Sequence, residues 1–339
     1  MARRSSARWP FVACVVLQTV IFGSGSAITK LAYESITPLW CLVVRFGLAA
    51  LVFGLFLGPR IVCQLRSVRV RDWLPAALCM ALSFITCNVA LDLTTATNVG
   101  FLVALPVVFA PLLSSIVNRR RYPFAFLPFQ GAVVAGLYLL CANGGAPSFG
   151  WGEALALLSS MTLAGALVFG ERGLERLDAA TIAGTQIGAS FVIALICALA
   201  FEPPMDVASV QPMAWGVIAF LALLSTCLTF FLQNVALSAL PSSTVSLLLT
   251  GEPVFTALFS FVILGETLSM TGLAGAAVIV AGVVAATWLE GRRAADVDDR
   301  LAHAPASEAH AEAASKAVEL PQVALPLPER RSLAADRTA

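Results

Sequence analysis

Charged residues are scarce in this chain, and their scarcity excludes most classes of soluble protein. Of the 339 residues, 12% are charged and 59% are hydrophobic, against roughly 25% and 45–50% in a soluble domain. A soluble helical domain would need charged helix faces, which this sequence does not supply. The net charge of +1 gives no general attraction to nucleic acid, so we expect no nucleic-acid partner.

The sequence also lacks the patterns that would hold a metal, a cofactor or a reaction centre. Both histidines, His303 and His310, lie in the polar C-terminal tail, so no apolar segment offers a histidine ligand. The eight cysteines form no C-x-x-C pair and are expected to be buried thiols without disulfides. No G-x-x-x-x-G-K-[ST] motif for ATP occurs, and the chain offers no nucleophile and base pair. We therefore expect no metal, no cofactor and no enzymatic activity.

Long apolar runs occupy most of the chain. Windows of about 20 residues, each able to cross roughly 30 Å of hydrocarbon, recur from Pro10 to Leu289. They predict an all-α polytopic membrane protein with about ten transmembrane helices. The first run is longer than the apolar part of a signal peptide, so we expect an uncleaved helix. Residues 291–339 are expected to be a disordered tail. The expected spans are residues 11–28, 39–57, 73–91, 99–117, 124–142, 149–170, 179–201, 213–237, 242–264 and 270–289.

Basic residues between these runs are unevenly distributed. If residues 1–9 are cytoplasmic, the cytoplasmic segments contain 14 Lys and Arg, and the opposite loops contain only Lys30. Cytoplasmic loops of membrane proteins carry an excess of Lys and Arg. We therefore expect a multi-pass protein of the plasma membrane, of the bacterial inner-membrane type, with both termini cytoplasmic.

The two halves of the chain resemble each other. The pentapeptide at residues 87–91, CNVAL, is similar to QNVAL at residues 233–237, and Pro106-Val107 is similar to Pro253-Val254. A weaker similarity places residues 28–47 opposite 169–188, with Arg45 opposite Gln186. Each copy, residues 10–142 and 149–290, contains five expected spans. Because five is odd, the copies would be inverted repeats, an arrangement typical of secondary transporters.

These residues resemble a known family. Glu252-Pro253-Val254 followed by Leu264-Gly265-Glu266, Arg45 in the second span, and the paired five-helix halves resemble the EamA-type transporters of the drug/metabolite transporter superfamily. The first half departs from the pattern, because Asn118-Arg119 stand where the second half has Gly265-Glu266. The resemblance implies ten helices and secondary transport, commonly export, of amino acids, other small metabolites or drugs. It does not identify the substrate.

Two charged residues lie deep within expected spans. Arg45 lies roughly 12 Å and Glu252 about 18 Å from the same membrane surface, at 1.5 Å per residue. Charges at such depths are costly in lipid, so both should face the protein interior. Arg45 could be a structural partner of helix carbonyls or of Glu252, could reach toward the interface, or could bind a substrate carboxylate. Glu252 could be structural, or could carry a proton or bind a cationic substrate.

Uncharged polar residues within the spans complete the candidate substrate site. Each amide could instead link two helices, and a tryptophan near a span end could anchor the helix at the interface or cover the cavity. These further candidates are Gln18, Trp40, Asn88, Gln186, Gln233 and Asn234.

The sequence favours a secondary active transporter that exports small metabolites such as amino acids by alternating access. Its partners would be a small-molecule substrate and the lipid bilayer, with coupling to protons or to exchange. Two alternatives stay open, a lipid or lipid-linked precursor translocase and a non-transporting membrane scaffold or receptor. The sequence leaves open the oligomeric state, monomer or homodimer.

Overall fold

The computed structural model describes residues 9–93, 102–117, 127–141, 150–264 and 269–303, together with Val99, Arg119 and Phe124. Within these ranges the chain is helical and contains no strand. Of the expected tail, residues 291–339, the part from residue 304 onward lies outside the described residues, as does the Gly265-Glu266 pair. The helices are α1 (Trp9–Ala32), α2 (Pro38–Ser67), α3 (Leu74–Leu93), α5 (Pro106–Val117), α6 (Leu127–Cys141), α7 (Trp151–Gly173), α8 (Ala179–Phe201), α9 (Pro212–Ala222), α10 (Thr229–Leu237), α11 (Ser242–Leu249), α12 (Glu252–Leu264) and α13 (Met270–His303), with a 3₁₀ turn η2 (Val70–Asp72) and a π-helix η4 (Leu223–Leu228).

Several of these helices are long and apolar enough to cross a membrane. By length and composition, five segments can cross a bilayer, namely α2, α3, α7, α8 and the continuous segment Pro212–Leu237. Shorter apolar stretches lie in α1, α5, α6 and α13. α13 continues to His303, so this helix ends later than the hydrophobic pattern alone predicts. The chain is a multi-pass helical membrane protein.

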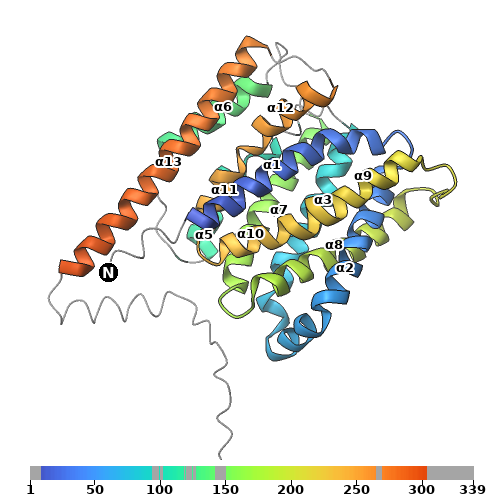
Figure 1. Ribbon diagram of the computed structural model, residues 1–339, viewed down its shortest axis with the longest axis horizontal. Coiled ribbons are helices and arrows are strands. Elements are labelled where there is room, and N and C mark those ends of the chain that lie inside the picture. Colours follow the sequence, from blue (N-terminus) through green and yellow to red (C-terminus); the bar gives the residue numbers. More distant parts are fainter. Residues whose placement is uncertain are drawn as a thin grey trace, which may run out of the picture.

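Helices α2 and α8 form an antiparallel pair along one edge of the bundle, and α6 and α13 lie along the opposite edge (Figure 1). Pro38 begins α2 at a position where its missing N–H costs nothing. The side chain of Glu202, just after α8, accepts from the backbone N–H groups of Leu39 (3.0 Å) and Trp40 (3.1 Å). We call this the Glu202 end of the bundle.

The other end of the α2 and α8 pair is also joined by hydrogen bonds. Asp178 is the N-cap of α8 and accepts from the backbone N–H of Thr181 at 2.7 Å. The same carboxylate accepts from Arg60 Nε (2.6 Å) and Gln64 Nε2 (2.7 Å) of α2. We call this the Asp178 end. A second ion pair, between Arg176 and Asp72 (2.9 Å), joins α7 to the start of α3 there.

Helices α6 and α13 are in close antiparallel contact. A Cβ atom added at Gly136 of α6 would lie 2.9 Å from the carbonyl oxygen of Gly275 and 2.9 Å from Ile279 Cγ1. Further along, a Cβ at Gly282 would lie 2.9 Å from Val133 Cγ2. Because glycine lacks this atom, the two helix backbones can approach closely.

Two helical segments are broken in the middle, at equivalent positions of the two halves. Leu105 N donates to Leu102 O (3.2 Å) and Val108 N to Leu105 O (2.9 Å). In the second half, Gly251 N donates to Leu248 O (3.2 Å) and Val254 N to Gly251 O (3.1 Å). These positions differ by 146, the offset that also aligns CNVAL with QNVAL. The expected single span 242–264 is therefore two helices, α11 and α12, with a turn at Thr250-Gly251 just before Pro253.

Candidate functional site

Arg45 is held by a π-helix. Its Nε donates to Thr226 Oγ1 (2.7 Å), and its Nη2 donates to the carbonyl oxygen (2.8 Å) and the hydroxyl (3.3 Å) of Ser225. The guanidinium carbon also lies 5.3 Å from the ring centre of Phe84 and 5.7 Å from that of Phe46. Arg45 is buried, with 7% of its surface exposed. The cation is thus stabilised by neutral dipoles and aromatic faces rather than by a counter-ion.

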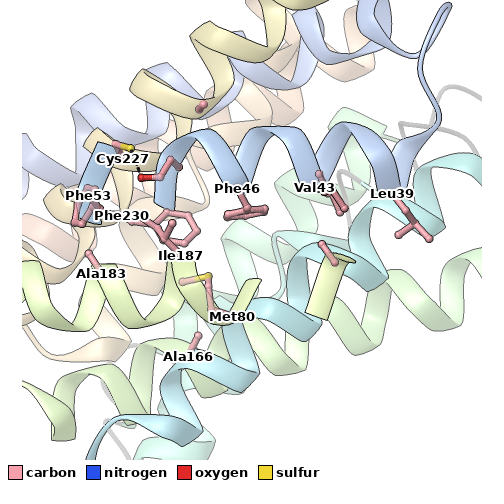
Figure 2. Close-up of a cluster of buried hydrophobic side chains, with 14 of the residues drawn as sticks. Leu39, Val43, Phe46, Phe53, Met80, Ala166, Ala183, Ile187, Cys227 and Phe230 are labelled. Carbon is pink, nitrogen blue, oxygen red and sulfur yellow. Dashed lines mark hydrogen bonds between the residues drawn. The ribbon is translucent and has the colours of Figure 1, made fainter. Parts of the chain in front are cut away.

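The local geometry of η4 explains why this segment can accept the guanidinium. In a π-helix the hydrogen bonds run from residue i to i+5, so one extra residue bulges out of the regular α-helical register. The bulge includes both Ser225 and Thr226. Cys227, also in η4, donates a weak bond to Ala49 O of α2 at 3.6 Å (Figure 2). The bulge therefore faces α2, the helix that carries Arg45.

One edge of the guanidinium is free. Among the residues that the structure describes, none accepts a hydrogen bond from Arg45 Nη1. Tyr33, directly after α1, donates a hydrogen bond to Asn88 Oδ1. Asn88 Nδ2 in turn donates to the Phe84 carbonyl at 2.8 Å. Arg45, Tyr33 and Asn88 form the first polar layer, on the Glu202 side.

An aromatic layer lies beneath the first polar layer. Phe46 of α2, Phe84 of α3 and Phe230 of α10 have ring centres 5.1 to 6.0 Å apart. Figure 2 shows Phe46, Phe230, Ile187 and Met80 meeting where these helices converge with α8. Offset and edge-to-face ring contacts of this kind exclude water from the space between them. The layer contains no polar side chain among its members.

A second polar layer lies on the Asp178 side of the aromatic layer. Gln18 Nε2 of α1 donates to Gln233 Oε1 at 2.8 Å, and Asn234 Nδ2 donates to Gln186 Oε1 of α8 at 2.8 Å. All four amides are buried, with at most 1% of each residue exposed. Counted along α2 and α8, Gln186 lies about 12 Å from the level of Arg45. The structure therefore places Arg45 and Asn88 in one polar layer and the four amides Gln18, Gln186, Gln233 and Asn234 in another.

Glu252 belongs to neither layer. It is the first residue of α12, directly after the break at Thr250-Gly251, where the N-terminal helix dipole favours a carboxylate. Its neighbour Gly251 packs against Thr19 of α1. Glu252 interacts electrostatically with Arg45, but it forms no ion pair or side-chain hydrogen bond with any residue in the described part of the chain. Arg45 and Glu252 are not paired in this structure.

Trp40 lies at the Glu202 end. Its indole Nε1 donates to the carbonyl oxygen of Pro203 at 2.7 Å, and its backbone N–H donates to Glu202. Trp40, which precedes Arg45 by five residues, thus links the start of α2 to the loop after α8. Tyr33, Ser225 and Thr226 are site residues that the sequence pattern did not predict. The signal that was present is the pair of hydroxyl residues at 225–226 in the middle of an apolar run.

A separate cavity of about 630 Å³ lies between α2, α8, η4 and α10. Its walls are mostly apolar, and its only charged lining residues are the paired Arg60 and Asp178. Two of its apolar lining residues, Leu223 and Phe231, are exposed on the surface of the bundle. The cavity therefore opens on the side of the bundle, and Arg45 is not among its lining residues.

Comparisons with known proteins agree with this architecture. The sequence model described as the EamA-like transporter family matches residues 9–142 and again residues 150–288. An uncharacterized transporter from Archaeoglobus fulgidus is 27% identical over 270 residues, covering 80% of this chain and 83% of that protein. The threonine/homoserine exporter RhtA from Escherichia coli K12 is 31% identical over 179 residues, 52% of this chain and 59% of RhtA. A crystal structure with 20% identity has a TM-score of 0.71 and covers 86% of this chain and 99% of that chain, which shows a shared fold.

Proposed function

Because the chain belongs to the EamA-like transporter family, we propose that this membrane transporter is a secondary active exporter of small polar metabolites. Residues 10–142 and 149–290 would be two inverted repeats of five spans each. Supporting this arrangement, helix breaks recur 146 residues apart, and α2 runs antiparallel to its counterpart α8. Inverted repeats of this kind place a substrate site between them that can open to either side.

The observation that carries the proposal is the placement of Arg45. The charge is buried within a span, and among the described residues it has no paired carboxylate and one guanidinium nitrogen without an acceptor. A buried cation held this way can bind a carboxylate strongly, because charge-assisted hydrogen bonds gain strength in a dry site. The substrate would therefore carry a carboxylate, as amino acids do. The relative RhtA is named as an exporter of threonine and homoserine, two compounds of this class.

Glu252 would couple transport to protons. It stands alone at the start of α12, near the Arg45 layer but unpaired with it. Protonation and deprotonation of a carboxylate inside a membrane protein commonly accompany the opening of one side and then the other. In a second conformation Glu252 would pair with Arg45 and displace the substrate.

The Asp178 end would be cytoplasmic. Arg60, Arg66, Arg69, Arg172 and Arg176 all lie at that end or in the segments next to it, as expected for a cytoplasmic surface of the inner membrane. The chain would then act as a carrier rather than an enzyme, with both termini inside the cell.

Transport assays in proteoliposomes test the proposal. The purified protein is reconstituted and screened for efflux and uptake of labelled amino acids and other metabolites, with and without a pH gradient. Arg45→Ala should slow transport of carboxylate substrates by about tenfold or more, and Arg66→Ala, which changes an exposed arginine on the same helix, should leave the rate unchanged. Glu252→Gln should retain exchange but lose the effect of the pH gradient. Wild-type rates in both Arg45→Ala and Glu252→Gln would contradict the proposed mechanism.

The lateral cavity favours a second candidate function, the movement of lipids. It is lined by apolar side chains, is bordered by the Arg60 and Asp178 pair, and opens on the side of the bundle. A lipid translocase would need such an opening. A scrambling assay with fluorescent phospholipids in the same vesicles distinguishes the two functions, because a metabolite exporter should leave the lipid distribution unchanged.

A further inference from the structure

The second polar layer has unsatisfied hydrogen-bonding atoms. One hydrogen bond joins the members of each of its two amide pairs, and in each pair one donor atom and one acceptor atom have no partner among the described residues. The unpaired acceptors are Gln18 Oε1 and Asn234 Oδ1, and the unpaired donors are Gln186 Nε2 and Gln233 Nε2. Buried polar atoms in native proteins almost always find a partner. The layer is therefore better suited to receive a ligand than to act only as a link between helices.

The number of free atoms does not depend on how the amides are oriented. Exchanging the nitrogen and oxygen of both members of a pair still leaves one free donor and one free acceptor in it. Gln233 and Asn234 are neighbours on α10 and direct the two pairs toward α1 and α8 respectively. The layer thus offers two donors and two acceptors around a single turn of α10.

Gly170 leaves room beside one of these pairs. A Cβ added to Gly170 of α7 would lie 3.6 Å from Asn234 Oδ1 and 3.9 Å from Gln186 Nε2. The missing side chain therefore leaves a space about the size of one methyl group that borders both free atoms. Glu171, the next residue, directs its carboxylate to the backbone N–H of Ser242 (3.0 Å) and not to these amides.

The layer is also the counterpart, in the other half of the chain, of the layer that holds Arg45. Asn88 and Asn234 are 146 residues apart, and each donates to the carbonyl oxygen four residues earlier at 2.8 Å. Arg45 is matched by Gln186 in the sequence similarity. The two layers therefore occupy corresponding positions on opposite sides of the aromatic layer. One contains a cation, whereas the other contains only neutral amides.

We propose that Gln18, Gln186, Gln233 and Asn234 form a second substrate subsite, on the Asp178 side of Phe46, Phe84 and Phe230, that binds a zwitterion. The ligand's ammonium group would donate to Gln18 Oε1 and Asn234 Oδ1, and its carboxylate would accept from Gln186 Nε2 and Gln233 Nε2. A ligand with net charge would be held less well, since no amide can neutralise the excess charge. This inference rests on the proposed transport function and adds a binding step on the side opposite Arg45.

The test compares binding from the two membrane faces. Uptake of labelled L-threonine is measured in inside-out and right-side-out membrane vesicles, with N-acetyl-L-threonine and L-threonine amide as anionic and cationic competitors. Asn234→Leu and its counterpart Asn88→Leu form a matched pair, because both residues make the same bond to their own helix. Asn234→Leu should raise the half-saturation concentration by about tenfold in inside-out vesicles and by less than about twofold in right-side-out vesicles. Asn88→Leu should show the reverse.

A structural role for the amides would give a different result. It would lower thermal stability or maximal rate equally on both faces and leave the half-saturation concentrations unchanged, which would overturn the inference. Equal competition by the charged analogues in inside-out vesicles would also overturn it. Absence of L-threonine transport by the wild-type protein would refute the zwitterion assignment, whereas the transport function itself would fail only if the wider metabolite screen found no substrate.

Discussion

At the scale of single residues, Arg45 shows how a membrane protein holds a cation without an anion beside it. Two hydroxyls, a backbone carbonyl and two aromatic faces share the charge. Hydrogen bonds to charged groups contribute about 1.5–3 kcal/mol each. The loss of one such bond should therefore be measurable even in a large helical bundle.

Thr226→Val tests that contribution. It removes the acceptor of Arg45 Nε and preserves the shape of the side chain, so we expect a loss of about 1.5–3 kcal/mol in the free energy of unfolding, measured by titration with a denaturing detergent. Thr185→Val is the matched control, since that hydroxyl bonds only to the Ile182 carbonyl of its own helix. An equal effect of both changes would mean that Arg45 does not depend on Thr226.

Asp178 should make stability depend on pH. Burial raises the pKa of its carboxyl, but hydrogen bonds from Thr181 and Gln64 and the charge of Arg60 outweigh this and leave the pKa below its ordinary value. A lowered pKa in the folded state stabilises the fold above the unfolded-state pKa of about 3.9, and this stabilisation is lost as the pH falls through the folded-state pKa. Asp178→Ala should thus cost about 0.5–2 kcal/mol at pH 7 and flatten the decline in stability below about pH 4.

Thermal unfolding in detergent at several pH values measures this effect. Asp92→Ala, which changes an exposed aspartate near the end of α3, provides the comparison and should leave the pH profile unaltered. The same profile for Asp178→Ala and the wild type would show that the cap does not contribute in this way.

At the scale of helices, the contact between α6 and α13 depends on glycine. Gly136→Val would place side-chain carbon atoms within 3 Å of the α13 backbone, and overpacking of this kind costs about 1–3 kcal/mol. Gly131 is in the same helix with no atom within 4 Å of its added Cβ, so Gly131→Val should change the melting temperature much less. Similar losses in both variants would point to helix propensity rather than packing.

The sequence predicted the positions of the helices well. It did not predict where those helices are interrupted. Hydrophobic length marks a span because a bilayer requires about 20 apolar residues. The π-helix at 223–228 leaves no trace in composition, because it is a change of hydrogen-bond register. Gly251 and Pro253 did signal the break between α11 and α12, but proline is tolerated within membrane helices, so the signal alone was ambiguous.

The candidate site was predicted by residue type and not by arrangement. Polar groups within apolar runs had to face inward, which selected Arg45, Glu252 and the amides. Their partners depended on the register between α2 and η4 and between α8 and α10, and no single sequence encodes that register in a readable way. The division into two layers also follows from the position of Phe46, Phe84 and Phe230, which a hydrophobicity pattern cannot distinguish from ordinary core residues.

At the scale of the whole molecule, different interactions hold α2 and α8 together at the two ends of the pair. Glu202 holds the first turn of α2 by its N–H groups, whereas Asp178 caps α8 and pairs with Arg60. Alternating access requires that one end open while the other remains closed. Each end can therefore be weakened separately by one substitution.

Glu202→Ala should shift the population toward a state open at the Glu202 end. Cys87, the residue before Asn88 in α3, reports access to the first polar layer in a variant where it is the only cysteine. Its modification by a charged thiosulfonate reagent should become about two- to tenfold faster in Glu202→Ala, in proportion to the open population. Asp178→Ala should not accelerate it. Equal acceleration by both changes would mean that the two ends do not open independently.

The hydrogen bonds between Arg45 and η4 also affect how the transporter would respond to the membrane potential. Moving one elementary charge across a membrane at 100 mV involves about 2.3 kcal/mol, but a guanidinium anchored to a backbone carbonyl of a neighbouring helix travels only as far as that helix does. If α2 and η4 shift together, the fixed cation crosses little of the field, and a zwitterionic cargo adds no charge of its own. In each cycle of such a carrier the coupling proton would be the main charge that crosses the field, so the membrane potential would act on transport through the proton and hardly at all through Arg45 or the cargo.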